Sequence, residues 1–195
     1  MTPVYSYRIA NQTTTTAGTG TISSSGTAVT GVSTAFTSQL TIGDVIHASG
    51  YNLVVTTITD ATHLALVTAP TAALSAAAFT ITTLAAGNLE TLSIRPPKGT
   101  FKPYADTVNL GNGTARAMGR PVASWLWGFM SLTQRNTLRA YCTGKSARVY
   151  ICTKVNDSSD SFVTYDAVML WPDEEKKFAG RRTDFEVLFR DLIAL

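Results

Sequence analysis

Residues 119–171 have the sequence GRPVASWLWGFMSLTQRNTLRAYCTGKSARVYICTKVNDSSDSFVTYDAVMLW, the segment of the chain richest in large aromatic residues. It contains all three tryptophans and both cysteines of the chain. Large aromatic side chains dominate the apolar area that a protein buries, so they mark the position of its core. We therefore expect the main hydrophobic core to be built from this stretch.

Residues 122–130 are apolar and aromatic, with Trp125, Trp127 and Phe129 at alternate positions. Successive side chains of a strand point to opposite faces, so this spacing predicts a strand with the three rings on one face. Three aromatic residues at this spacing are more often core than a platform that stacks sugars. We expect them to be core.

A helix is predicted over about residues 132–143. Ser131 or Thr133 can cap its start, because a hydroxyl oxygen accepts a hydrogen bond from the free amides of a first turn. Gly144 is expected to end it, since glycine tolerates the left-handed conformation that closes many helices.

Three more strands are predicted after this helix. Residues 147–152 alternate, which favours a strand with Ala147, Val149 and Ile151 on a packed face and a wetter opposite face. The turn residues at 155–160 and the apolar run at 162–171 complete a hairpin. After a charged turn, residues 185–190 alternate again as a closing strand. The predicted order is strand, helix, then three strands.

Residues 18–84 contain short β-branched segments at a spacing of about ten residues, separated by Gly, Ser, Asp and Asn. This pattern is typical of a small all-β barrel or sandwich. The expected strands are 19–23, 27–32, 44–48, 53–58, 64–67 and 79–83. Phe36, Leu40 and Ile42 are expected to pack against one end of the core of this module.

The flanking segments are less regular. Residues 1–17 are expected to be a linker or an edge strand, because a tract of four threonines has no packing pattern. The basic, proline-containing segment 95–103 is either a surface loop or an extension that reaches a neighbouring subunit. Residues 104–110 and 114–118 predict a hairpin around Gly111-Asn112-Gly113, since Asn and Gly accept positive φ. Together these patterns predict a mainly β chain with a module at 18–84 and, at 85–195, a β-sandwich or split barrel with one flanking helix.

The totals fit one full domain and one small module, because the chain has 195 residues, 45% of them hydrophobic. No run of 18 apolar residues and no signal-peptide pattern is present, so we expect neither a membrane span nor secretion. Synthesis in a cytoplasm is the expectation. Cys142 and Cys152 are expected to be reduced packing residues, with a disulfide between them as the alternative.

The net charge of +3 conceals an uneven distribution. Residues 1–88 carry three charged side chains, residues 95–154 have ten bases against one acid, and residues 155–195 have five bases against nine acids. Either these charges pair within one subunit, or unlike faces meet between subunits. The candidate subunit interface consists of a basic set and an acidic set: Arg95, Lys98, Lys102, Arg116 and Arg120, and Asp173, Glu174 and Glu175.

Other kinds of site have little support in the sequence. The two histidines, His47 and His63, accompany no nucleophile motif, so no catalytic residues and no enzymatic activity are predicted. They also lack a matching ligand set, and Asp173 to Glu175 lie next to two lysines, so no metal site is expected. Gly111 to Gly113 lacks the lysine of a phosphate-binding loop. We predict no cofactor and no specific binding of nucleic acid.

Two resemblances point to a class of protein. The pattern GTGTISSSGTAVTG, TAF, IGDVI and the hairpin VTTITD with LALVTAP is similar to a β-module found in phage virion and bacterial surface proteins. From residue 92 on, six segments resemble a family of tailed-bacteriophage tail proteins: SIRPPKGTFKPY, TVNLGNGTARAMGRP, SWLWGFMSLTQRNTLRAY, ARVYICTKVND, YDAVMLWPDEE and GRRTDFEVLFRDL. The tail resemblance implies a β-sandwich or split barrel with one helix, like tail-tube and distal-tail proteins, that assembles into hexameric rings.

The expected function is therefore that of a structural virion protein, a tube, distal-tail or minor tail component that contacts copies of itself and neighbouring tail proteins. The alternative is a module that recognises a host-surface glycan. Residues 18–84 have only three aromatic side chains, which counts against a sugar platform there.

Overall fold

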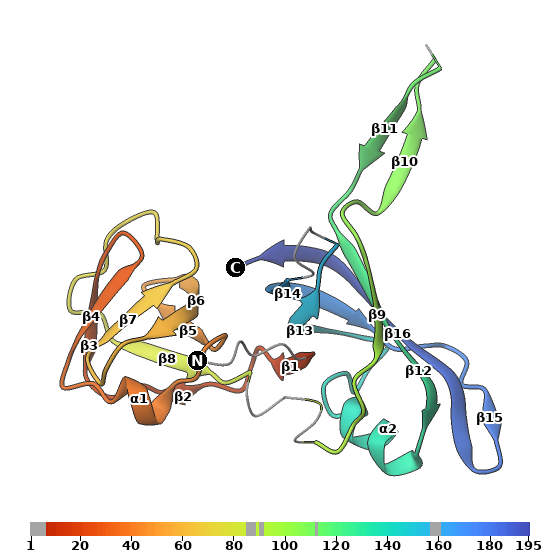
Figure 1. Ribbon diagram of the computed structural model, residues 1–195, viewed down its shortest axis with the longest axis horizontal. Coiled ribbons are helices and arrows are strands. Elements are labelled where there is room, and N and C mark those ends of the chain that lie inside the picture. The colour runs from red at the N-terminus through yellow and green to blue at the C-terminus, as the bar shows by residue number, and fades with distance from the viewer. Residues whose placement is uncertain (1–6, 85–88, 90–91, 112, 157–160) are drawn as a thin grey trace. The chain divides into compact units, whose positions relative to one another are not determined.

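The computed structural model describes residues 7–84, 89, 92–111, 113–156 and 161–195, and they form two compact units (Figure 1). One unit contains residues 10–84. The other contains residues 7–9 and the described residues from 89 to 194. The fold is mainly β with antiparallel sheets and one substantial helix, which confirms the predicted fold class.

The second unit is organised around one sheet with the strand order β1-β13-β14-β16-β12-β9. Each pair of neighbours from β13 to β9 is antiparallel. The short β15 pairs with β16 outside this path. The bounds are β1 Arg8–Asn11, β9 Lys98–Lys102, β12 Val122–Met130, β13 Ser146–Lys154, β14 Phe162–Leu170, β15 Lys177–Phe178 and β16 Arg181–Ala194.

Helix α2 (Leu132–Arg139) follows β12, and β13, β14 and β16 then follow as the three predicted strands, with the two-residue β15 as an addition before β16. Ser131 is the cap: its hydroxyl accepts from the Gln134 amide, and the Gln134 side chain accepts from the Ser131 amide. The helix ends before Gly144, because the amides of residues 140–142 bond three residues back and tighten the chain into turns. Among the described residues, no helix is long and apolar enough to cross a membrane.

The tryptophans lie in the core of the second unit, as predicted. Trp125 is fully buried, and its indole Nε1 donates to Thr153 Oγ1 at 3.0 Å. The Trp127 indole donates to the Arg95 carbonyl at 2.7 Å. Neither buried donor is left without an acceptor, which removes the main cost of placing an indole in a core. The apolar side chains packed with them include Val149, Ile151, Met169, Phe185, Val187 and Phe189.

Two expectations about strand faces were wrong. Phe129 is 63% exposed rather than packed beside Trp127, and the inward position after Trp127 is Met130. The cause lies in β16, where Asp184, between the partners of Trp127 and Phe129, has a φ of 49° and interrupts the regular pleat. In β13, the face expected to be wetter is exposed at Arg148 but buried at Tyr150 and Cys152.

The first unit confirms the six strands expected in residues 18–84. Its sheet has the order β2-β8-β5-β6-β7-β4-β3, and a one-turn helix α1 (Phe36–Gln39) lies between β4 and β5. Phe36 and Leu40 are buried in its core, as predicted, and Ile42 is half-buried. The bounds are β2 Thr16–Ala17, β3 Thr21–Ser25, β4 Ala28–Val32, β5 Val45–Ala48, β6 Tyr51–Ile58, β7 His63–Leu66 and β8 Phe79–Thr82.

The β-module is inserted into the second unit rather than attached before it. Strand β1 belongs to the large sheet as its edge next to β13, so the edge-strand alternative for residues 1–17 applies to 8–11. The chain then builds the module and returns at Leu89, whose amide donates to the Tyr7 carbonyl at 3.4 Å. The two ends of the insertion therefore leave and re-enter the second unit at neighbouring points.

A hairpin forms a separate two-stranded sheet in the second unit, and it extends away from β9 and β12 (Figure 1). Its strands are β10 (Asp106–Asn109) and β11 (Ala115–Met118), as the sequence predicted. Gly113 has a φ of 81°, which favours glycine in the turn. Asn112 and residues 157–160, part of the other predicted turn, lie outside the described residues.

The insertion leads to a prediction about truncation. A chain that starts at residue 89 lacks β1, whose Ile9 is completely buried in the core of the second unit. A chain in which a short Gly-Ser linker replaces residues 13–87 keeps this strand. We expect the linker variant to unfold cooperatively in urea and the truncated chain to be destabilised by about 2 kcal/mol or more, because it loses a buried side chain and the edge pairing. Equal unfolding midpoints for the two chains would show that β1 contributes no stability.

Candidate assembly surfaces

The hairpin of β10 and β11, called here the projecting hairpin, has two different faces. Its register pairs Asp106 with Met118 and Val108 with Arg116, and directly opposite residues share a face. Every residue of both strands is exposed, Val108 at 42% and Met118 at 49%. Leu110, also 42% exposed, continues this face beyond β10 by alternation. The opposite face carries only small or polar side chains: Thr107, Asn109, Ala115 and Ala117.

This arrangement leaves large apolar side chains in water. A hairpin of two strands alone is at best marginally stable, and it gains stability when a further layer covers its apolar face. Within the part of the chain that the structure describes, no sheet pairs with β10 or β11. The face of Asp106, Val108, Leu110, Arg116 and Met118 is thus a candidate contact surface.

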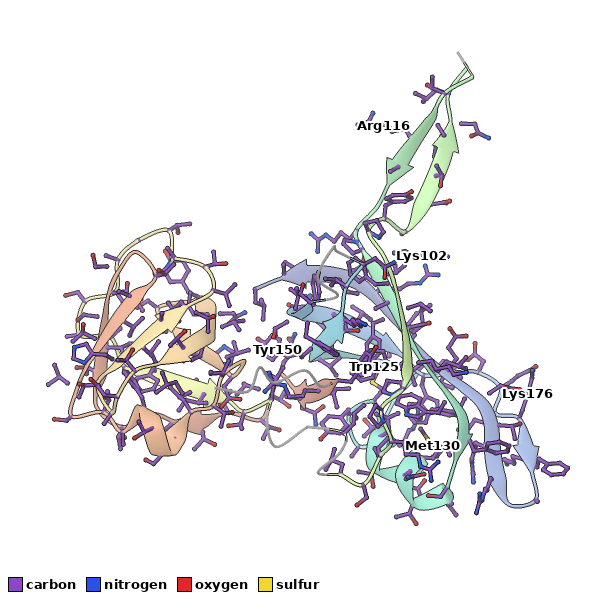
Figure 2. All side chains as sticks on the ribbon, viewed as in Figure 1. Lys102, Arg116, Trp125, Met130, Tyr150 and Lys176 are labelled. Atoms are coloured by element: carbon purple, nitrogen blue, oxygen red, sulfur yellow. The ribbon has the colours of Figure 1, made fainter. Side chains whose placement is uncertain are left out.

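Most of the predicted basic set lies along or beside this hairpin. Arg116 is on its apolar face, and Lys102 precedes it in the chain; both are labelled in Figure 2. Arg120 follows the hairpin in the chain. Lys98 and Lys102 are the two ends of β9, the last strand of the large sheet. Charged side chains on an edge strand discourage indiscriminate pairing of its free backbone groups. All of these side chains are exposed.

The fifth basic residue, Arg95, lies apart from the others in the loop before β9. Its side chain is exposed beside a hollow of about 430 Å³ that Phe129, Ser131 and Arg181 also line. Its backbone carbonyl is the acceptor of the Trp127 indole. The structure therefore gives the backbone of Arg95 a core role and leaves the side chain on the surface.

The predicted acidic set divides into two kinds of residue. Asp173 and Glu174 are exposed, and Asp173 approaches Lys145 at 3.8 Å in a pair that is almost entirely in water. An exposed pair of this kind contributes little, about 0–1 kcal/mol. Glu175 is only 13% exposed, so it does not belong to the exposed acidic surface.

Glu175 joins helix α2 to the sheet. Its carboxylate accepts from Arg135 Nε at 2.9 Å, from Arg182 Nε at 3.2 Å and from the Trp171 indole at 3.2 Å. The Arg135 guanidinium lies 5.0 Å from the centre of the Trp171 ring and that of Arg139 lies 4.6 Å from it. Both helix arginines therefore pack on one tryptophan while one of them binds the carboxylate.

This network shifts the pKa of Glu175. Partial burial acts to raise it, but the hydrogen bonds from Arg135, Arg182 and Trp171 outweigh burial and lower the pKa from 4.5 to about 2. For this residue, the explanation that charges pair within one subunit holds. The hypothesis of an interface between subunits therefore rests on the exposed residues of the basic and acidic sets.

A groove of about 430 Å³ lies next to the exposed acids. Its apolar lining is Leu170, Leu188, Trp171 and Pro172, and Leu170 and Leu188 are cross-strand partners in β14 and β16. Four carboxylates surround it: Asp173, Glu174, Asp184 and Glu186. We call it the acidic groove.

Asp184 and Glu186 were not among the predicted site residues. The alternation of Phe185, Val187 and Phe189 places Glu186 on the opposite, outward face, and this signal was present in the sequence. Its proximity to Asp173 and Glu174 depends on the pairing of β14 with β16, which local patterns do not specify.

The histidines and cysteines have structural partners. His47 bonds Asn52 Oδ1 at 2.7 Å and Thr82 Oγ1 at 2.8 Å, whereas the His63 imidazole lies 3.0 Å from a carboxylate oxygen of Asp60. In the described ranges no group of three or more His, Cys, Asp or Glu residues could hold a metal ion.

Cys142 and Cys152 are buried free thiols. Burial raises the pKa of both thiols. They are therefore packing residues, and the alternative of a disulfide between them is not realised in this structure.

A shallow depression on the module is the candidate place for a glycan. It measures about 290 Å³ and is lined by His47, Tyr51, Asn52 and Phe79 among others. Phe79 is buried, and His47 and Asn52 bond each other. Tyr51 is half-buried, and its hydroxyl bonds Thr71. The depression therefore offers a sugar little aromatic area, and its main polar groups already have partners.

We expect replacement of Glu175 to destabilise the second unit. In Glu175→Gln the partly buried guanidiniums of Arg135 and Arg182 lose their charged acceptor, which should cost about 2–3 kcal/mol in urea unfolding. The matched control is Glu174→Gln, one residue away and exposed, for which we expect a change below about 0.5 kcal/mol. Similar losses in the two variants would contradict this role of Glu175.

The same network predicts a pH dependence. Because folding lowers the pKa of Glu175, its ionised form stabilises the fold fully above its ordinary pKa of 4.5, and this contribution disappears as the pH falls toward about 2. The difference in unfolding free energy between the parent and Glu175→Gln should therefore be constant from about pH 6 to 7 and shrink below about pH 4.5. A difference that stays constant down to about pH 2.5 would contradict the assignment.

Comparison of the chain with family models, curated proteins and solved structures gave no match. A function for this protein is therefore inferred from the surfaces described above and from the sequence patterns.

Proposed function

We propose that the chain is a structural protein that acts by assembling with copies of itself. The observation that carries this proposal is the projecting hairpin, which holds Val108, Leu110 and Met118 in water on one face. Few soluble monomers keep a hairpin of this kind without a function for it, because exposed apolar patches mark interaction sites.

We further propose that this assembly is part of the tail of a tailed bacteriophage. Support comes from the six segments after residue 92 that resemble tail proteins, and from the mainly β unit with one flanking helix that the resemblance implies. In this proposal the protein forms a homo-oligomeric ring, with six subunits as the number that the resemblance implies. It occupies the virion as a tube, distal-tail or minor tail component next to other tail proteins.

The mechanism would be mechanical rather than catalytic. Apolar burial supplies most of the affinity between subunits, and the exposed charges select the register in which they meet. A contact between two different surfaces of the same chain repeats from subunit to subunit, and it closes into a ring when the rotation permits. The inserted β-module lies outside this minimal repeating unit and would decorate the assembly.

The test is the state of the purified protein as a function of concentration. We expect light scattering after size-exclusion chromatography to show a mass that rises with concentration to a closed oligomer, and negative-stain microscopy to show rings or stacked rings. A monomer of 20.8 kDa up to millimolar concentration would overturn the proposed assembly. For the assignment to a virion, mass spectrometry of purified tailed particles should find the chain in several copies per particle.

A further inference from the structure

We propose that the projecting hairpin of one subunit binds in the acidic groove of the next copy of this chain. This inference rests on the proposed function and adds the two surfaces that would meet. The second copy is the occupant that the chemistry of the two surfaces favours, because each supplies what the other lacks.

The groove has an apolar floor with an anionic rim. Leu170 and Leu188 are half-buried cross-strand neighbours, and Pro172 extends the apolar lining. Asp173, Glu174, Asp184 and Glu186 are all exposed around it. A partner that fits this groove must present aliphatic side chains together with a positive charge.

The apolar face of the hairpin has this composition. Val108, Leu110 and Met118 are its aliphatic side chains, and Arg116 lies directly opposite Val108. Asp106, opposite Met118, is also on this face, and its carboxylate accepts a hydrogen bond from the backbone amide of Thr107 at 2.7 Å. An arginine suits carboxylates especially well, because its planar guanidinium donates two parallel hydrogen bonds. Lys102 and Arg120, which flank the hairpin in the chain, add positive charge at its base.

The charges on the groove remain available for such a partner. Of its four carboxylates, Asp173 faces Lys145 at 3.8 Å, and that pair is exposed and weak. The stronger cations nearby, Arg135 and Arg182, are bound to Glu175 instead. Arg135 and Arg182 thus neutralise Glu175, and the carboxylates around the groove keep its rim anionic.

The geometry of the contact also fits repetition. The hairpin and the groove are different surfaces, so their contact is heterologous and each subunit can use both at once. In a closed ring every subunit is held by two such contacts, so a subunit leaves the ring less easily than it leaves a dimer held by one contact.

The experiment exchanges the charges of the two surfaces in the full-length chain. The hairpin variant is Arg116→Glu, and the groove variant is Glu174→Lys with Glu186→Lys. These positions are exposed, so we expect the fold to be retained, which circular dichroism and urea unfolding check. Each variant alone should need at least about tenfold more protein for half-assembly, measured by sedimentation velocity at low salt.

Mixing the two variants gives the decisive result. In an equal mixture, the reversed charge of the hairpin variant meets the introduced lysines of the groove variant, while the unmodified hairpin meets the unmodified groove. Assembly should therefore return toward that of the parent. Ala117→Glu is the control, because it places a new negative charge on the opposite face of the same hairpin. We expect this control to assemble like the parent.

The outcomes separate the two proposals. If the parent assembles and the charge variants assemble equally well, or if the mixture fails to restore assembly, the hairpin does not bind this groove, while the proposed function stands. A control as defective as Arg116→Glu would likewise overturn the assigned face. If the parent remains a monomer, the proposed function and this inference both fall.

Discussion

The second unit depends on the pairing of β12 with β16. This ladder aligns Trp125 with Val187 and Trp127 with Phe185, so the two strands that bring the largest side chains to the core are held in one register. Strand β16 also pairs with β14 on its other side, and β12 continues directly into the capped helix. A slip of one residue in this ladder would turn the aromatic face toward solvent, so the whole unit relies on one alignment.

The same strand departs from regular geometry at two aspartates with positive φ. Asp184 interrupts the pleat beside Phe129, and Asp191 lies where the ladder with β14 shifts register. An extra residue in a strand changes which side chains point inward, and Leu192 is buried beyond this shift although alternation from Phe189 would point it outward. One of the two irregular positions, Asp184, also lines the acidic groove.

Local sequence patterns were sufficient to predict most helices and strands of this fold. They were insufficient to predict which side chains are buried by partners far away in the sequence. Alternation and turn residues predicted the module strands, the hairpin around Gly113 and the helix capped by Ser131, because each depends on neighbours in sequence. The burial of Tyr150 and the exposure of Phe129 depend on partners elsewhere, and no local pattern carries that information. For the candidate surfaces, composition identified the charged sets but did not distinguish Glu175, which is bound within the subunit, from Glu174, which is exposed.

The inserted position of the β-module also constrains how the chain folds during synthesis. Strand β1 leaves the ribosome first, but its partner β13 follows only after the entire module, so this pairing has a very large separation in sequence. Contacts of this kind form slowly, because a long intervening segment must first be closed into a loop. A module that folds early shortens this loop by bringing its own ends together, and the Tyr7 and Leu89 backbones meet at that junction. Inside the module, β2 near its start pairs with β8 near its end, Thr16 opposite Ile81, so its own fold holds these two points of the chain together.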